Sequence, residues 1–305
     1  MQLSPIQTQK KRILVTGGAG FIGSHLTQAL LGQGYAVRVL DNLSYGKHEW
    51  IPVDAECVIG DITNLETCHR AMEGIYAVFH CAAMSRAAPS FTDLRSCTET
   101  NIVGTQNILL AARDAHVQKI IYSGSSTYYG NQPVPHHEYH TPGEFLNFYA
   151  LSKHVGEEYC LMFDSVFDLP CVILRYFNVY GPRQPRAGAY ALVMGIFLDR
   201  LSRGEVLEIH GDGSQSRDFI HVQDVVQANI AALVQPVRHA IFNIGSGTHI
   251  SIQALANKIS SNQRHMPRRA GDAEITLADI QRARTLLHWE PVINIDQGIA
   301  ELIMS

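Results

Sequence analysis

Long apolar and basic runs are missing from this sequence. No apolar stretch approaches the ~20 residues that a bilayer-spanning helix needs, and the initial segment, MQLSPIQTQKKR, lacks the apolar core of a secretory signal. No block of lysines and arginines exceeds Lys10–Arg12, and the net charge is −4 with an isoelectric point near 6.4. These absences predict a cytoplasmic protein that binds neither membrane nor nucleic acid.

Paired cysteines and the histidine spacing of a zinc site are also absent. The six cysteines are scattered without a C-x-x-C pair, and several lie within apolar runs, so we interpret them as reduced, buried thiols. The segment HHEYH, at His136–His140, lacks the H-E-x-x-H spacing and is flanked by Pro135 and Pro142. We predict a polar loop there and no metal site.

The sequence does contain short apolar runs that alternate with helical patterns. Its 305 residues, 46% hydrophobic and 17% charged, suffice for one large domain or two coupled ones. Near-continuous apolar strands between helices predict a parallel, doubly wound sheet covered on both faces. The predicted strands are Ile13–Thr16, Ala36–Leu40, Cys57–Ile59, Ala77–Cys81, Lys119–Ser123 and Cys171–Arg175, with a late return to the sheet at Ala240–Gly245.

The alternation changes after Arg175, where loops rich in Gly, Pro and polar residues begin. We therefore predict an α/β protein with a smaller, discontinuous C-terminal substrate-binding domain. The larger domain, which we expect to be a dinucleotide-binding Rossmann domain, would comprise residues 1–178 plus about 219–250. The smaller domain would comprise about 179–218 plus 251–305.

The stretch ILVTGGAGFIGSHL places three glycines between the first strand and the first helix. Gly17 permits the tight turn, Gly20 lets the backbone approach a pyrophosphate, and Gly23 allows close helix–strand packing, as in a Rossmann fold. Asp41 ends the second strand, where a carboxylate accepts from a ribose 2′-OH and repels a 2′-phosphate. No arginine follows closely, so the pattern favours NAD over NADP. The alternative is a glycine-rich turn without a ligand.

Two further strand ends are candidates for the cofactor site. Asp61 follows the third strand in GDI, where it could meet an adenine amino group or cap the next helix. The small residues of Cys81–Ala83 follow the fourth strand and would let a cofactor lie against the backbone.

Hydroxyl groups crowd the end of the fifth strand, in SGSSTYYG, and Tyr149 and Lys153 follow in NFYALSK. The four-residue spacing puts both side chains on one helical face. A nearby ammonium stabilises a phenolate and lowers a tyrosine pKa from about 10, so Tyr149 could take a proton from a substrate hydroxyl while hydride leaves for a nicotinamide. Alternatively, Tyr149 packs on the core and Lys153 is solvated.

Taken together, these stretches resemble the extended short-chain dehydrogenase/reductases, and among them the NAD-dependent nucleotide-sugar epimerases and dehydratases similar to UDP-glucose and UDP-N-acetylglucosamine 4-epimerases. The matching stretches are TGGAGFIG, DNLSYG, GDI, NIVGTQNIL, YALSK, RYFNVYGPRQ, GDGSQSRDFIHVQDV, FNIGSG and RAGD…TLADI, from about Arg12 to the C-terminus. The resemblance implies Tyr149 as base, Lys153 as its partner and Ser125 as the catalytic hydroxyl. Gly124 stands where the family usually has a serine, a change that we expect to be tolerated.

The resemblance also implies a set of cofactor-binding residues. These are Gly17, Gly20, Phe21, Ile22, Gly23, Asp41, Asn42, Asp61, Ile62, Ala82, Ala83, Ser123, Tyr149, Lys153 and Tyr176.

On the substrate side, the resemblance implies Arg217 and Arg269 for a diphosphate, which the planar guanidinium binds bidentately. It further implies Asp272 for ribose hydroxyls and Asn178 for phosphate, with Ser125 and Ser126 near the sugar. Thr276 would be a small gate residue that leaves room for an N-acetyl group, and Arg86 would meet a sugar substituent. The alternatives are a turn role for Asn178, an Arg217–Asp218 ion pair, a solvated Arg86, and Arg268 in place of Arg269.

The family resemblance favours 4-epimerisation through a 4-keto sugar. The dehydratases of this group carry an Asp-Glu pair after the catalytic threonine, whereas this chain has Tyr128 and Tyr129 after Thr127. The implied substrates are UDP-glucose and UDP-galactose, with UDP-GlcNAc and UDP-GalNAc next. Alternatives are a UDP-glucuronate 4-epimerase or decarboxylase, a 4-keto-sugar reductase and a non-catalytic NAD-binding regulator. The resemblance also implies a homodimer formed by helices at about Asp93–Ala115 and Tyr149–Phe163.

Overall fold

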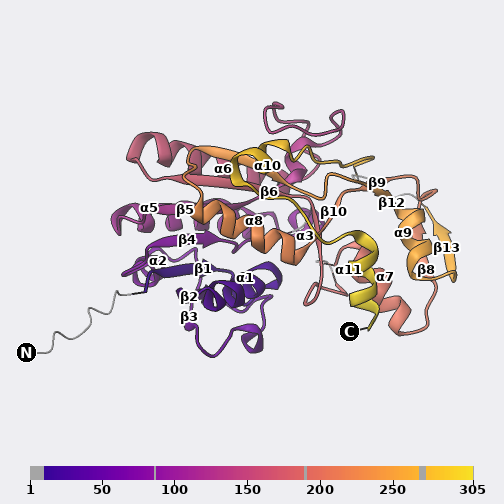
Figure 1. Cartoon of the computed structure of the whole chain (residues 1–305), viewed down its shortest axis with the longest axis horizontal. Helices are drawn as coiled ribbons and strands as arrows, with labels where there is room; N and C mark the ends of the chain where they lie inside the picture. The colour runs from indigo at the N-terminus through magenta and orange to yellow at the C-terminus, as the bar shows by residue number, and fades with distance from the viewer. Residues whose placement is uncertain (1–9, 86, 189–190, 268–272, 305) are drawn as a thin grey trace, which may run out of the picture.

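A seven-stranded parallel sheet forms the centre of the molecule (Figure 1). The computed structural model describes residues 10–85, 87–188, 191–267 and 273–304. The strand order is β11-β6-β5-β4-β1-β2-β3, with every neighbouring pair parallel. The strands are β1 (Arg12–Thr16), β2 (Ala36–Asp41), β3 (Glu56–Ile59), β4 (Ala77–His80), β5 (Lys119–Ser125), β6 (Cys171–Tyr176) and β11 (Ala240–Ile244). The predicted doubly wound sheet is confirmed.

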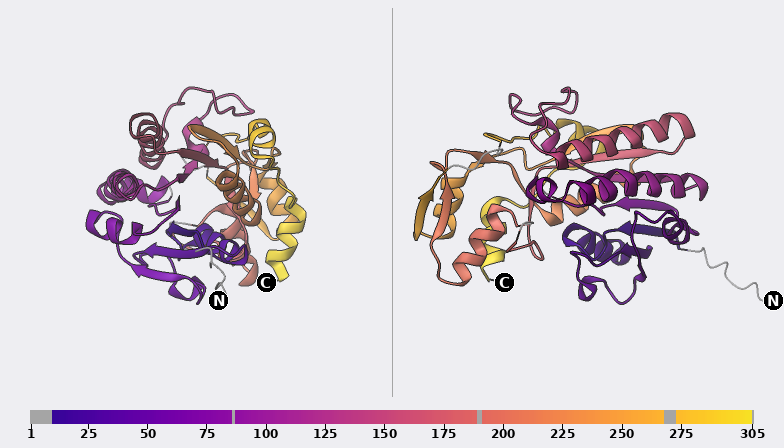
Figure 2. Two further views of the ribbon diagram at one scale, coloured as in Figure 1. Left: turned by 60° about the vertical axis from the view of Figure 1, so that its left-hand side comes forward. Right: turned by 180° about the vertical axis from the view of Figure 1, so that it is seen from behind.

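Helices cover both faces of this sheet because its central strands are apolar on both sides. One face packs against α1 (Phe21–Gly32), α8 (Val222–Val234) and α10 (Gln281–Leu287), whose side chains share one core cluster with the strands. The other face packs against α2 (Leu65–Met72), α5 (Thr105–Asp114) and α6 (Phe148–Phe167). The rear view in Figure 2 shows α5 and α6 side by side.

The strand β3 lies at the edge of the sheet, and one prediction about its cysteine is wrong. Within the described residues only β2 pairs with it, and Cys57 in this strand is exposed, so the prediction of a buried thiol is wrong at this position. An edge strand has one open side, which a short apolar run such as CVI does not reveal. All six cysteines are free thiols.

Small elements beyond the carboxyl ends of the sheet strands form a second core (Figure 1). In this region β7 pairs with β10, β8 with β13, and β9 with β12. Its elements are β7 (Asn178–Tyr180), α7 (Val193–Ser202), β8 (Leu207–His210), β9 (Ser216–Arg217), β10 (Phe219–His221), β12 (Ile250–Ser251), α9 (Ile252–Ile259), β13 (Gln263–Met266) and α11 (Ile295–Met304). In contrast, α10 returns to the sheet and packs against β11 and α8.

The remaining elements are short and lie before or between the main helices. They are η1 (His48–Trp50), α3 (Ala87–Thr92), α4 (Leu94–Thr98), the π-helix η2 (Glu99–Gly104) and η3 (Ser126–Tyr129). No helix in the part of the chain that the structure describes is long and apolar enough to span a membrane.

A buried ion pair lies beneath the end of β5. Arg175 of β6 donates to the Glu157 carboxylate of α6 over 2.8 and 3.0 Å, and both side chains are at most 2% exposed. A Cβ added to Gly124 would lie 2.8 Å from Glu157 Oε1. A serine at this position would therefore collide with the ion pair, which explains why the chain has a glycine here.

Replacing Glu157 with Gln leaves the Arg175 charge buried without its counter-charge. We expect Glu157→Gln to lower the free energy of unfolding by about 3 kcal/mol or more, measured by urea denaturation. The control is Glu158→Gln, because the neighbouring Glu158 side chain is 63% exposed and its loss costs little. Equal stabilities of the two variants would contradict this account.

Candidate active site

A cleft of about 1230 Å³ runs from the carboxyl ends of the sheet strands to the second core. It brings together residues that lie far apart in the sequence, from the glycine turn to the segment before α10. The predicted residues that line it are Gly17, Gly20, Phe21, Ile22, Gly23, Asp41, Asn42, Asp61, Ile62, Ala82, Ala83, Ser123, Ser125, Ser126, Tyr149, Lys153, Tyr176, Asn178, Arg217 and Thr276.

Two glycines between β1 and the first turn of α1, Gly17 and Gly23, have no room for a side chain. Gly17 has φ +69°, and a Cβ on it would lie 2.8 Å from the Ala82 backbone nitrogen. A Cβ on Gly23 would lie 2.2 Å from the Gly17 oxygen. The N-terminus of α1 has no side-chain cap, so its N–H groups are available to an anion. These features fit the pyrophosphate of a dinucleotide.

Asp41 links the end of β2 to the glycine turn. Its two carboxylate oxygens accept from Ala19 N over 2.9 Å and from Leu43 N over 2.8 Å. The carboxylate is therefore held in place at the cleft wall, where it can still accept from ribose hydroxyls because each oxygen has two acceptor sites. This placement fits NAD, as the sequence predicts.

Asp61 does not cap the helix that follows it. The cap of α2 is Asn64, whose side chain accepts from Thr67 N over 2.8 Å. Burial raises the pKa of Asp61, but hydrogen bonds from Thr63 and Asn42 outweigh burial and hold this pKa below its usual value. The helix-cap alternative is thus wrong, and a contact with adenine stays a prediction.

The predicted catalytic residues lie in the cleft where β5 ends and where α6 begins. Ser125 ends β5, and its hydroxyl lies 2.8 Å from Thr127 Oγ1. Tyr149 lies in the first turn of α6 and is half-buried. Lys153 follows one turn later and is only 5% exposed, with Nζ 4.2 Å from the centre of the Tyr122 ring. The alternative of a solvated Lys153 is therefore wrong.

Burial changes the acid–base chemistry of Lys153. Loss of hydration lowers the pKa of its ammonium to about 8, although Glu157 acts in the opposite direction. The group is still mostly charged at neutral pH. A cation that has lost its water interacts more strongly with a nearby phenolate than a solvated one would.

Ser123 and Tyr176 form a second polar group beside the catalytic residues. Their hydroxyls lie 3.3 Å apart, and Tyr176 donates to Asn229 Oδ1 over 2.9 Å. Ser123 also donates to the sulfur of Cys81 over 3.4 Å. Burial raises the pKa of Tyr176, so its hydroxyl stays protonated.

On the substrate side, three predicted residues meet around the backbone of Asp218. The Asn178 amide donates to Asp218 O over 3.0 Å and to Thr276 Oγ1 over 3.2 Å. The Thr276 hydroxyl also accepts from Asp218 N. Arg217 lines the cleft and donates to Ser216 O and Glu274 O. The hydroxyl oxygen of Thr276 thus accepts from two groups of the protein, and Thr276 lines the cleft with a small side chain.

Asp218 itself is fully buried, and its carboxylate accepts from Ser246, Gly247 and Ala278. These bonds hold the substrate-side loops together. Four candidates from the sequence analysis, Arg86, Arg268, Arg269 and Asp272, lie outside the described residues.

The cleft also contains polar residues that the sequence analysis did not assign to it. No motif spacing marked them, because they come from loops and from the second core. They include Asn147, Arg183, Arg200, Glu208, His210 and Gln215.

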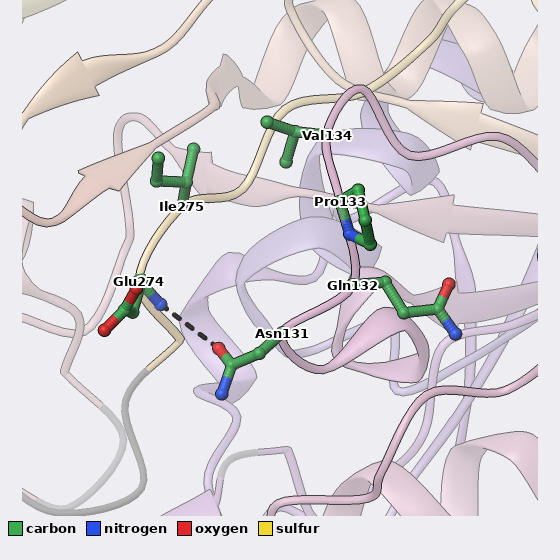
Figure 3. A pocket seen from close by; sticks show the side chains of 6 residues that line it. All are labelled: Asn131, Gln132, Pro133, Val134, Glu274 and Ile275. Atoms are coloured by element: carbon green, nitrogen blue, oxygen red, sulfur yellow. Dashed lines mark hydrogen bonds between the residues drawn. The ribbon is translucent and has the colours of Figure 1, made fainter.

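A small hollow of about 150 Å³ lies beside the cleft, between residues 131–134 and residues 274–275 (Figure 3). Asn131 Oδ1 accepts from Glu274 N across it, over 3.3 Å. This hydrogen bond connects the loop after η3 to the segment that contains Thr276.

The predicted polar loop at His136–His140 continues this contact. His136 N donates to Leu277 O over 2.8 Å, and Asp279 N donates to His136 O over 2.9 Å. The imidazole is fully buried and stacks on the Tyr129 ring at 4.6 Å. The loop is present, but its first histidine belongs to the interior. Within the described ranges, no group of three or more His, Cys, Asp or Glu is arranged to hold a metal.

The parallel sheet, the glycine turn and the Tyr149–Lys153 pair define an extended short-chain dehydrogenase/reductase. The chain belongs to the NAD dependent epimerase/dehydratase family, whose model matches residues 13–245.

Individual relatives align over almost the full chain. A UDP-glucose 4-epimerase of Mycolicibacterium smegmatis is 35% identical over 96% of this chain and 97% of its own. A UDP-N-acetyl-alpha-D-glucosaminuronate decarboxylase of Bacillus cytotoxicus is also 35% identical, over the same shares. The crystal structure of UDP-glucose 4-epimerase from Thermotoga maritima with UDP-glucose is 35% identical, has a TM-score of 0.92, and covers 96% of this chain and 97% of its own.

The lowered pKa of Lys153 predicts a pH-dependent stability. An unfolded lysine has a pKa of about 10.4, so between pH 8 and this value the unfolded chain binds more protons than the folded one. Stability conferred by Lys153 should therefore rise across this window.

We expect the free energy of unfolding of the wild type, minus that of Lys153→Met, to rise by up to about 3 kcal/mol from pH 8 to pH 10.4. Urea denaturation without added NAD measures both proteins. Lys10→Met is the control, since Lys10 is exposed. A flat curve for Lys153→Met would show that Lys153 titrates normally.

Proposed function

We propose that this protein is an NAD-dependent nucleotide-sugar 4-epimerase that acts on UDP-hexoses. One observation supports this proposal most directly. Tyr149, buried Lys153 and the Ser125–Thr127 hydroxyls lie in the same cleft as the glycine turn. The sequence similarity to a UDP-glucose 4-epimerase over nearly the whole chain supports it.

The residues of the chain account for the proton transfers of this reaction. Bound NAD supplies a hydride acceptor that returns the same hydride. Tyr149 takes the proton of the sugar 4-hydroxyl, the Lys153 ammonium stabilises the resulting phenolate, and Ser125 donates to the sugar oxygen. After the 4-keto sugar has turned over, Tyr149 returns the proton. The reaction needs no external reductant because its oxidation and reduction cancel.

The proposed cofactor contacts follow the cleft wall. The α1 N-terminus and its glycines would hold the pyrophosphate, and Asp41 a ribose. Asp61 and Asn42 would lie near the adenine, with Ser123 and Tyr176 towards the nicotinamide.

The proposed substrate contacts involve a different set of residues from the proposed cofactor contacts. Arg217 and Asn178 would bind the diphosphate, together with Arg269 and Asp272 as the family resemblance implies. Thr276 leaves space for an N-acetyl substituent. We further propose that the reaction takes place in the cytoplasm, which the six free thiols support.

A second candidate is a UDP-uronate decarboxylase, favoured by the equally similar Bacillus cytotoxicus relative. It would use the same 4-oxidation but release CO2. Release of CO2 from UDP-glucuronate, in place of 4-epimer formation, would favour it.

We propose a homodimer that buries α4 and α6. Apolar side chains are exposed along these helices and the adjoining α3 and η2. They are Phe91, Leu94, Val103, Phe148, Leu151, Met162, Val166 and Phe167. Two such helices from each subunit could pack as a four-helix contact.

Tyr149→Phe removes only the phenolic hydroxyl. We expect kcat for UDP-glucose epimerisation to fall by at least about 1000-fold, because the proton acceptor is lost. NAD binding, followed by calorimetry, should change less than about threefold. A variant that keeps full activity would rule out Tyr149 as the base.

Met162→Glu tests the dimer, since Met162 is 62% exposed on α6. A buried unpaired carboxylate at the interface should convert the dimer to a monomer in sedimentation velocity. Val292→Glu is the control, because Val292 is 77% exposed outside these helices. A monomeric wild type, or a dimeric Met162→Glu protein, would contradict this interface.

A further inference from the structure

Asn147 lies at the start of the catalytic helix, two residues before Tyr149. Asn147 is one of the residues that line the cleft, and it is half-buried. Its backbone is extended, and its Oδ1 accepts from Ala150 N over 2.8 Å. Asn147 therefore both caps α6 and lines the cleft.

The cap fixes how the carboxamide is oriented. Only its oxygen can accept the N–H of Ala150, so the NH2 group is the part that remains. Among the described residues, the Asn147 NH2 has no hydrogen-bond partner. Because the amide is planar, this donor has a fixed direction and loses little side-chain entropy when a ligand binds.

Capping alone does not require an amide. Asn, Asp and Ser cap helices about equally well, and a negative Asp gains from the helix dipole. The chain itself uses Asp93 to cap α4 and Ser251 to cap α9. Capping thus explains the Asn147 oxygen and leaves its NH2 group unexplained.

Packing holds this part of α6 in place. Phe148, between Asn147 and Tyr149, packs edge-on against Phe91 of α3 at 5.9 Å between ring centres. Phe148 is not among the residues that line the cleft, whereas both of its neighbours are. The two neighbours therefore contact the cleft from a helix start that is fixed by a cap and by an aromatic pair.

We propose that Asn147 determines specificity for the sugar, by donating a hydrogen bond from its NH2 group to a polar substituent near the reacting carbon. This inference rests on the proposed function, since it takes the substrate carbon to lie at Tyr149. Hydroxyl, N-acetyl and carboxylate oxygens are all acceptors for this neutral donor. A carboxylate in place of the amide would present acceptors to acceptors.

The test uses Asn147→Asp and Asn147→Ser, which both keep a capping oxygen. Calorimetry measures binding of UDP-glucose and of UDP, and product analysis measures kcat and KM for UDP-glucose. We expect affinity and kcat/KM for UDP-glucose to fall about 5- to 10-fold in Asn147→Ser and at least about 10-fold in Asn147→Asp. Affinity for UDP, which has no sugar, should stay within about twofold of the wild type.

The matched controls are Asn64→Asp and Asn64→Ser, at a helix cap that does not line the cleft. They should bind and turn over UDP-glucose like the wild type. The inference is overturned when the Asn147 variants match the wild type with UDP-glucose, or when they lose UDP and UDP-glucose affinity equally. A wild type without epimerase activity would instead overturn the proposed function, and this inference with it.

Discussion

The burial of one cation, Lys153, is the constraint on which the rest of the site depends. An ammonium group without its water is costly, and the fold holds it there, 4.2 Å from the Tyr122 ring and beneath the end of β5. The cost is useful because a dehydrated cation stabilises a nearby phenolate more strongly than a solvated one. The capped, packed start of α6 then places Tyr149 one turn away from it.

The substrate side depends on a different buried group. Asp218 accepts hydrogen bonds from two loops, while its backbone bonds to Asn178 and Thr276. The segment with Thr276 is supported from its other side by the loop that contains Asn131 and His136. Residues from three distant parts of the chain thereby acquire fixed positions around one cleft, as preorganised binding requires.

Part of this arrangement could be predicted from the sequence because local geometry determines it. The turn at Gly17 and Gly23 excludes side chains, so the glycines at these positions predict the turn from the sequence alone. Continuous apolar strands likewise predicted the two-sided sheet. Helical spacing placed Tyr149 and Lys153 on one face.

The sequence did not predict how deeply individual side chains are buried or which groups they hydrogen-bond to. Spacing gives the face of Lys153 but not its burial, which comes from β5 and Tyr122. The size of Thr276 is readable, yet its hydroxyl bonds to residues about 60 and 100 positions away in the chain. Exposure of Cys57 depends on which strand ends the sheet, and the cap of α2 falls to Asn64 because the helix begins later than Asp61 alone suggests.

If this cleft removes a hydride from a sugar carbon and returns it to the other face of the same carbon, that hydrogen must stay with the sugar. The direct measurement uses UDP-glucose deuterated at C4, incubated with the protein and NAD without added reductant, and analysed by NMR. We expect UDP-galactose that keeps the deuterium at C4. Loss of the deuterium to solvent, or failure to form UDP-galactose, would contradict it.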